Sequence, residues 1–384
     1  MNIESLQRER LTRARRIVVK VGSRVLVGPS GKPSPERIER IVGQVSNLRK
    51  QGVEVVIVSS GAIAAGVDAL GLKSRPENVP DLQMAASVGQ PKLLAIYSKL
   101  FSKRRLSISQ VLLTHEDLTN RNRHLNARNA MLRSLQAGIV PIVNENDTVA
   151  VDEIQVGDND VLAAMVAVLI DADALLLLST TNGLRKTGAG RSSRISFISS
   201  LTDSEKSLVS AKRDKLSTGG MATKLESAAT AAKAGVLSLI ADGRKKTVIE
   251  DALSGKNVGT LIGVSERSLS DVQRARKRWI AFFHRADGSL QVDAGAARAL
   301  IAQRTSLLPV GVKSVEGSFA RGALVNILSP DGEIIGRGLV SYSADDLQNI
   351  CGKRSSAVKK LFGPHAYEEV IHRDNLVVLN EGAC

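Results

Sequence analysis

The sequence predicts an α/β protein, in which a mainly parallel sheet covered by helices on both faces is followed by a smaller β-rich domain. Short apolar runs alternate with amphipathic stretches over the first two-thirds of the 384 residues. Small and hydrogen-bonding residues follow most of these runs, at the point where a strand would end. From Gly288 onward, short strands and turn sequences replace the alternation. Strand and helix in alternation indicate βαβ units, which require parallel pairing.

Five apolar runs predict the strands of the first domain, and the segments between them predict its helices. The runs are rich in leucine and β-branched residues and are nearly continuous, as expected of strands buried on both faces. They comprise residues 17–21, 53–58, 139–143, 174–178 and 236–241. The helical segments comprise residues 34–50, 81–101, 124–137, 159–170 and 223–234, and the last is followed by Gly235, a suitable C-cap.

The C-terminal part has a different pattern. Residues 323–328 and 333–340 predict two short strands on either side of Ser329-Pro330-Asp331-Gly332, a strong hairpin turn. Residues 294–303 and 344–350 predict helices. Ahead of this part, basic residues crowd around Trp279, which indicates a linker or a docking helix. The predicted organisation is a first domain over residues 1–265, a basic linker over 266–287, a second domain over 288–371 and a tail over 372–384.

Composition excludes several classes of protein. An apolar fraction of 43% and a charged fraction of 24% are ordinary for a globular chain, and 384 residues can bury a core without disulfides. The longest apolar run, residues 161–170, is far shorter than the ~20 residues of a membrane span. Cys351 and Cys384 form no CxxC motif, and the arginine-rich opening contains glutamates and little serine. These features predict a cytoplasmic protein of two or three domains.

The net charge of +15 suggests an anionic partner. Residues 288–384 carry ten basic and ten acidic residues, so the whole excess lies in residues 1–287. Aromatic residues make up only 3% of the chain, which leaves few platforms for stacking nucleic-acid bases. A polyanionic small molecule fits this charge as well as a nucleic acid does. A solvated basic face without a specific partner is the third possibility.

Lys20 is the first candidate site residue. It lies among β-branched neighbours just before Gly22, in a strand whose pattern indicates burial on both faces. A lone buried ammonium is costly, and an anionic ligand at the end of the strand would remove that cost. Gly22 would let the backbone approach such a ligand closely. The alternative is an edge strand with Lys20 in solvent.

Polar groups also gather in three other segments. Ser59-Ser60-Gly61 leads into a helix, where the serines can cap the helix or the free amides can hold a carboxylate or a phosphate. Asn144-Glu145-Asn146-Asp147 and Gly157-Asp158-Asn159-Asp160 suit an amino group, a metal or lysine ammoniums, or they are two ordinary acidic turns. Asp158 could cap the helix that follows. The ligand spacing is not that of an EF-hand.

Residues 218–224 (TGGMATK) contain a pair of glycines and precede an alanine-rich helix. Paired glycines at a helix N-terminus form a phosphate cradle, here with Lys224 in the first turn or so. The glycine spacing is neither that of a P-loop nor that of a dinucleotide site. Two lysines, glycine-rich turns and an acidic cluster together favour phosphoryl transfer, because its transition state spreads negative charge over the transferred group. The five histidines are scattered and have no assigned role.

Taken as a set, these motifs resemble those of the glutamate 5-kinases, in the amino acid kinase family, in order and spacing over nearly the whole chain. They are residues 17–23 (IVVKVGS), 60–66 (SGAIAAG), 144–147 (NEND), 156–160 (VGDND) and 218–224 (TGGMATK). Residues 306–309 (SLLP) and 311–315 (GVKSV) resemble the PUA domain attached to many bacterial members. The resemblance implies an αβα sandwich with a mainly parallel sheet, the amino acid kinase fold, followed by a PUA-like β-barrel.

The resemblance also implies ATP- and Mg²⁺-dependent phosphorylation of the side-chain carboxylate of L-glutamate, the first step toward proline. Lys20 and Lys224 would bind phosphate oxygens, and Asp160 would hold both lysines in place. Ser60, Gly61, Asp147 and Asn159 would bind glutamate. ATP would be bound by Lys20, Gly22, Ser179, Thr180, Thr218, Gly219, Gly220, Met221, Ala222, Thr223 and Lys224. Inhibition by proline at the glutamate site and a homodimer or homotetramer are implied as well, and no residue is assigned as a metal ligand.

The chain departs from the family pattern at one point, and alternatives remain open. The family often has Thr-Asp after the fourth predicted strand, where this chain has Ser179-Thr180, so one carboxylate is missing there. PUA domains bind RNA in other proteins, but phosphate contacts dominate RNA affinity and residues 288–384 have zero net charge, which argues against nucleic acid. The alternatives are a kinase acting on N-acetylglutamate, aspartate or a nucleoside monophosphate, and an RNA-binding regulatory protein. The carboxylates of residues 144–147 suit a free ammonium, which favours an unacetylated amino acid.

Overall fold

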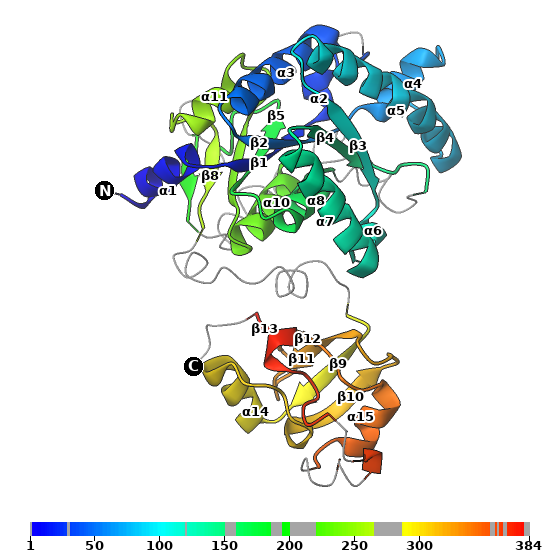
Figure 1. Ribbon diagram of the computed structural model, residues 1–384, viewed down its shortest axis with the longest axis vertical. Helices are drawn as coiled ribbons and strands as arrows, with labels where there is room; N and C mark the ends of the chain where they lie inside the picture. Colours follow the sequence, from blue (N-terminus) through cyan, green and yellow to red (C-terminus); the bar gives the residue numbers. More distant parts are fainter. Residues whose placement is uncertain are drawn as a thin grey trace. The chain divides into compact units, whose positions relative to one another are not determined.

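The computed structural model describes residues 2–28, 31–119, 121–149, 159–185, 194–199, 220–264, 286–353, 358, 361–363 and 367–379. Contacts divide the chain into two compact units, Met1–Val272 and Gln273–Cys384 (Figure 1). The basic linker predicted over residues 266–287 lies outside the described residues as far as residue 285. Within the described ranges, none of the helices is both long and apolar enough to cross a membrane.

The first unit is built on an eight-stranded sheet in the order β3-β4-β2-β1-β5-β7-β8-β6. The strands are β1 (Arg16–Val21), β2 (Glu54–Ser59), β3 (Ile108–Leu113), β4 (Val140–Glu145), β5 (Ala174–Ser179), β6 (Phe197–Ile198), β7 (Leu237–Asp242) and β8 (Thr260–Ile262). Neighbouring strands from β3 to β7 are all parallel, and β8 pairs antiparallel with β7 and parallel with β6. The prediction of a mainly parallel sheet is therefore confirmed.

Three of these strands are not predicted by the apolar runs. β3 is the edge strand next to β4, and most of its side chains are only half-buried. Its Ser109 and Gln110 interrupt the apolar pattern that a doubly covered strand would show. β6 and β8 have two and three residues, too few to form a recognisable run. The sheet is therefore wider than the sequence pattern indicates.

Helices cover both faces of this sheet (Figure 1). They are α1 (Ile3–Thr12), α2 (Ser23–Leu26), α3 (Pro35–Lys50), α4 (Ala62–Ala69), α5 (Val79–Ser102), α6 (His115–Thr119), α7 (Arg121–Gln136), α8 (Asn159–Leu169), α10 (Met221–Lys233) and α11 (Val248–Leu253). α3 and α11 lie on one face, and α8 and α10 lie on the opposite face. The covered sheet confirms the predicted fold class.

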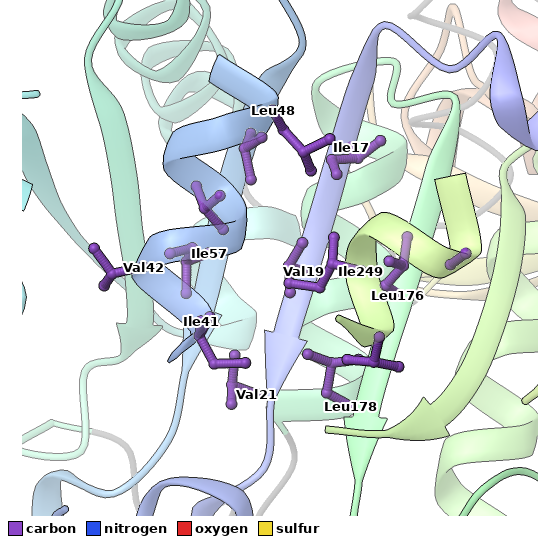
Figure 2. Packing of buried hydrophobic residues seen from close by; sticks show 14 of the residues in the cluster. Ile17, Val19, Val21, Ile41, Val42, Leu48, Ile57, Leu176, Leu178 and Ile249 are labelled. Carbon is purple, nitrogen blue, oxygen red and sulfur yellow. The ribbon is translucent and has the colours of Figure 1, made fainter. Parts of the chain in front are cut away.

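Alternation along β1 decides which helices each of its side chains meets. Ile17, Val19 and Val21 are fully buried and point toward α3 and α11 (Figure 2). Successive residues of a strand point to opposite faces, so Val18 and Lys20 point toward α8 and α10. β1 is therefore almost entirely apolar, and its one buried lysine, Lys20, has its ammonium group on the face of the sheet against which α8 and α10 pack.

α4 and α5 pack backbone to backbone through two glycines. A Cβ on Gly89 of α5 would lie 1.8 Å from the carbonyl oxygen of Ala62. A Cβ on Gly66 of α4 would lie 1.7 Å from the carbonyl oxygen of Ala85. Both contacts are with backbone, which cannot move aside without separating the helices. This close packing fixes the position at which α4 begins.

The substitution Gly89→Ala is therefore expected to destabilise the protein by ~1–3 kcal/mol, the usual cost of overpacking. Thermal unfolding of the intact protein would measure the effect. Gly43→Ala, in the interior of α3, is the matched control because its Cβ would meet nothing nearer than Arg104 Nη2 at 3.8 Å. This control is expected to be neutral or to stabilise by about 0.4–1 kcal/mol. Equal changes in both variants would contradict the close packing.

The second unit contains a five-stranded sheet in the order β10-β9-β11-β12-β13. Its elements are β9 (Gly288–Val292), α14 (Ala294–Arg298), a π-helical turn (Ala299–Gln303), a 3₁₀ turn (Pro309–Gly311), β10 (Val312–Gly317), β11 (Leu324–Leu328), β12 (Ile334–Leu339), α15 (Ala344–Ile350), a second 3₁₀ turn (Arg373–Asn375) and β13 (Leu376–Val378). β11 and β12 form the predicted antiparallel hairpin. The helix predicted over residues 294–303 ends its α-helical part at Arg298 and continues as the π-helical turn.

Candidate active site

The carboxyl ends of β1, β5 and β7 lie side by side in the middle of the sheet. Val21 pairs in register with Leu178, and Ser179 pairs with Asp242. The chain leaves β1 toward β2 on one side and leaves β5 toward β7 on the other, which makes a topological switch point between β1 and β5. Open α/β sheets bind their ligands at such a point.

Gly22 and Ser179 lie at this edge of the sheet. The Gly22 amide donates a hydrogen bond to the carbonyl oxygen of Leu178 at 3.1 Å. A Cβ on Gly22 would lie 3.2 Å from the same oxygen, so a larger residue would crowd the end of β5. Close approach of a ligand to the backbone of Gly22 stays a prediction.

Lys20, Asp160 and Lys224 form one buried cluster. Lys20 Nζ lies 2.6 Å from Asp160 Oδ1, and Lys224 Nζ lies 2.8 Å from Asp160 Oδ2. Lys20 and Lys224 are 5% and 8% exposed, and Asp160 is fully buried. Asp160 lies in the first turn of α8 and Lys224 in the first turn of α10, so two helix starts and one strand meet at this carboxylate. The alternative of an edge strand with Lys20 in solvent is wrong.

The charges of this cluster do not cancel, because two ammoniums share one carboxylate. Burial by itself raises the pKa of Asp160, but Lys20 and Lys224 together lower it by more, so its pKa lies below the ordinary value. Asp160 is therefore ionised at neutral pH, and these three side chains taken alone contribute two positive charges and one negative charge. A buried positive charge favours binding of an anion.

The four residues predicted to bind substrate line a single cavity of about 540 Å³. They are Ser60, Gly61, Asp147 and Asn159. Asn159 precedes Asp160 in α8, so this cavity adjoins the cluster of charges. The structure thus brings together residues that are separated by up to 99 positions in the chain.

Amide groups form a hydrogen-bond chain along one side of this cavity. Asn159 Nδ2 donates to Ser60 Oγ at 3.2 Å and to Asn144 Oδ1 at 3.1 Å. Asn144 Nδ2 in turn donates to Gln90 Oε1 at 2.7 Å. Asn159 Oδ1 is buried and accepts no hydrogen bond from the described residues. It is an acceptor held in place and suited to a ligand N–H.

The predicted capping of α4 by a serine is wrong. The N-cap is Gly61, in the left-handed conformation with φ of 107°, and no side chain caps the helix. Ser60 instead turns its hydroxyl toward Asn159. Gly61 meets no neighbouring atom that would exclude a Cβ, so its positive φ is what requires glycine here. The first amides of α4 are left without a side-chain partner at the cavity.

Asp147 supplies negative charge to the cavity. Burial raises its pKa to about 6, while the nearby Arg75 acts in the opposite direction. Sequence reasoning missed Arg75, which lies in an exposed connection between α4 and α5 that has no periodic pattern. Asn144 and Glu145, which the sequence assigns only as part of the motif over residues 144–147, also line this cavity.

The nucleotide-binding residues predicted from the sequence are only partly described. Thr218 and Gly219 lie outside the described residues. Gly220 is the N-cap of α10, and no side chain caps this helix. Met221, Ala222 and Thr223 form the start of the helix, and Lys224, the next residue, belongs to the buried cluster. A helix start of this kind favours phosphate.

Ser179 ends β5, and Thr180 follows it next to an arginine that sequence reasoning missed. Arg244 Nη2 donates to the carbonyl oxygen of Thr180 at 2.7 Å. Its Nε and Nη2 also donate to the two carboxylate oxygens of Asp242, at 2.9 and 2.8 Å. This bidentate ion pair, together with the hydrogen bond to Thr180, holds the segment after β7 next to the segment after β5.

Comparison with known proteins places both units in families. Residues 15–241 match the amino acid kinase family, and residues 288–362 match the PUA domain. A glutamate 5-kinase from Moorella thermoacetica is 43% identical over 372 residues, which are 96% of this chain and 97% of that protein. Glutamate 5-kinases from Trichlorobacter lovleyi and a Geobacter species are 43% and 42% identical, over 97% of this chain and 99% and 100% of their own lengths.

Proposed function

The chain belongs to the amino acid kinase family, and from this premise we propose that it transfers the γ-phosphoryl group of ATP to the side-chain carboxylate of L-glutamate. The products are ADP and L-glutamyl 5-phosphate, and the reaction is the first step of proline biosynthesis. The observation that carries the proposal is the buried cluster of Lys20, Asp160 and Lys224 beside a cavity with acceptors for an ammonium.

In this reaction a carboxylate oxygen forms the new bond to phosphorus while the bond to the bridging oxygen of ADP breaks. The attacking carboxylate is already ionised at neutral pH, so no proton has to be removed from it. The site's main task is to hold two anions together and to stabilise the charge on the transferred group. Lys20 and Lys224 bind the phosphate oxygens, and Asp160 holds both ammoniums in place.

Glutamate binds in the cavity through Ser60, Gly61, Asp147 and Asn159. Its α-ammonium donates to Asp147 and to Asn159 Oδ1, the buried acceptor with no partner among the described residues. An N-acetyl group would replace this ammonium by a neutral amide and leave Asp147 unpaired. A free amino acid is therefore the better substrate.

ATP binds on the other side of the cluster, through Gly22, Ser179, Thr180 and the start of α10 with Lys224. Uncapped amides and a buried net positive charge at this place fit its phosphates. Mg²⁺ would enter with ATP, because Mg²⁺ is commonly held by substrate phosphates and one or two carboxylates. Among the described residues there is no cluster of three metal-ligating side chains. When bound, Mg²⁺ neutralises phosphate charge.

An ADP-release assay over several acceptors tests the substrate. L-Glutamate is expected to turn over faster than N-acetyl-L-glutamate, L-aspartate or a nucleoside monophosphate, each with ATP and Mg²⁺. Faster turnover of N-acetyl-L-glutamate would contradict the assignment of Asp147 and Asn159. We further propose that proline binds in the same cavity and that the enzyme is a cytoplasmic homo-oligomer. Inhibition by proline that is competitive with L-glutamate would support the first of these two proposals.

Asp147→Asn is expected to raise the KM for L-glutamate roughly 10–100-fold with little change in kcat, because a charge-assisted hydrogen bond to the ground state is lost. In the native protein, Asp147 must be ionised to bind the ammonium, and its pKa is about 6. The KM should therefore rise as the pH falls below about 6, and Asp147→Asn should abolish this dependence. Steady-state kinetics between about pH 5 and pH 8 would measure both effects.

Asp68→Asn is the matched control for this experiment. Asp68 also lines the cavity but pairs with Lys32 at 2.6 Å on its exposed side. The control should leave the KM for glutamate and its pH dependence unchanged. A large loss of kcat at unchanged KM in Asp147→Asn would count against a binding role.

A further inference from the structure

Arg75 is a cation of the cavity to which neither the sequence motifs nor the proposed reaction gives a role. Its side chain is exposed, and it makes no hydrogen bond or ion pair with the described residues. Six charged side chains line the cavity: Lys32, Asp68, Lys73, Arg75, Glu145 and Asp147. Lys32 is engaged by Asp68 at 2.6 Å. Lys73 and Arg75 therefore remain as the cations available to a ligand.

Arg75 and Asp147 form an open pair of opposite charges. Arg75 acts electrostatically on Asp147, yet the two side chains make no ion pair within 4.0 Å. A molecule carrying an ammonium and a carboxylate on one carbon atom would fit between them with each charge matched. A guanidinium is the side chain best shaped for a carboxylate, because two of its N–H groups can bind both oxygens.

We propose that Arg75 binds the α-carboxylate of the amino acid substrate while Asp147 accepts the α-ammonium, so that Arg75 selects for a free α-carboxylate. The inference rests on the proposed function and adds a specificity determinant to it. The γ-carboxylate of the substrate is then directed away from Arg75. Asn159 and Asp160 are successive residues of α8, so the reacting end can reach the lysines next to Asp160.

The test compares two substrates that differ only at the α-carboxylate, L-glutamate and its α-amide, L-isoglutamine. Arg75→Gln is expected to raise the KM for L-glutamate roughly 10–100-fold, the value of a lost charge-assisted hydrogen bond, and to leave the KM for L-isoglutamine nearly unchanged. The preference for L-glutamate should therefore collapse. Arg75→Lys should retain part of the preference, because it keeps the charge but loses the planar geometry.

Lys73→Gln removes a charge of the same sign from the same connection and is the matched control. It should leave the preference unchanged. The acid limb of kcat/KM provides a second readout, because loss of the Arg75 charge should shift the titration of Asp147 to higher pH. Only Arg75→Gln should produce this shift, although Lys32, Lys73, Asp68 and Glu145 also line the cavity.

Three results would overturn the inference. Equal losses for both substrates would show that Arg75 supports the fold of the connection rather than the carboxylate. An equal effect of Lys73→Gln would show that the general potential of the cavity matters and not the position of Arg75. An unchanged preference in Arg75→Gln, with normal turnover of L-glutamate by the native protein, would overturn the role of Arg75 alone. Absence of L-glutamate turnover by the native protein would overturn the proposed function as well.

Discussion

Lys224→Ala is expected to lower kcat by roughly 10²–10³ and to leave the KM for L-glutamate nearly unchanged. In the proposed reaction Lys224 stabilises charge that develops on the transferred group, and among the described residues it pairs with Asp160 and does not line the cavity. The fold should persist, because Asp160 keeps its ion pair with Lys20 at 2.6 Å. Steady-state kinetics combined with circular dichroism would separate catalysis from folding.

The matched control for this variant is Lys233→Ala. Lys233 lies in the last turn of the same helix and is exposed. The control variant therefore removes one positive charge from α10 at the end remote from the cluster. Its kinetics should equal those of the native protein. Turnover near the native value in Lys224→Ala would remove Lys224 from the catalytic machinery and leave the cluster a structural feature.

Asp160→Asn is expected to have the larger effect on the protein as a whole. It removes the carboxylate that both buried ammoniums contact, and removing one partner of a buried ion pair costs about 3–5 kcal/mol. The kcat should fall at least as far as in Lys224→Ala, because both lysines lose their fixed positions. Thermal and denaturant unfolding of the intact protein would measure the loss of stability in the first unit, and ADP release would measure the loss of turnover.

The pH dependence of stability gives an independent check of Asp160. Its pKa in the folded state is lowered, so its contribution to stability is present above the unfolded pKa of about 3.9 and is lost as the pH falls through the folded value. Asp160→Asn should remove this component of acid unfolding. Adding Lys20→Met to Asp160→Asn should restore part of the stability, because the repulsion disappears, but none of the activity.

Asp171→Asn, just beyond the C-terminal end of α8, is the control. Asp171 pairs with Arg128 at 2.8 Å but its side chain is 30% exposed, and such pairs contribute about 1 kcal/mol or less. A comparable destabilisation by Asp160→Asn and Asp171→Asn would contradict the account of the buried cluster.

The central part of the site could be predicted from the sequence because it depends on local patterns. A lysine in an apolar strand indicates burial with a partner, and an acidic turn ahead of an apolar helix places a carboxylate at a helix start. The parallel sheet then brings strand ends and helix starts to one edge. The pairing of Lys20 with Asp160 itself is implied only by the resemblance, because the residues alone leave the partner of this carboxylate open.

The remaining parts of the site depend on contacts that local patterns do not encode. Arg75 comes from an exposed connection, and the bond from Arg244 to Thr180 joins residues 64 positions apart. Ser60 does not cap the helix that follows it. Its hydroxyl instead accepts a hydrogen bond from Asn159 of α8. Tertiary contact overrides local preference at these positions.

The most direct test of the proposed reaction is to trap the product of phosphoryl transfer. An acyl phosphate reacts with hydroxylamine to give a stable hydroxamate, so the native protein should form the γ-hydroxamate of glutamate from L-glutamate, ATP and Mg²⁺, in step with ADP. The Lys224→Ala protein should form it at a rate lower by roughly 10²–10³. ADP release with another acceptor, and no hydroxamate from L-glutamate, would contradict the account.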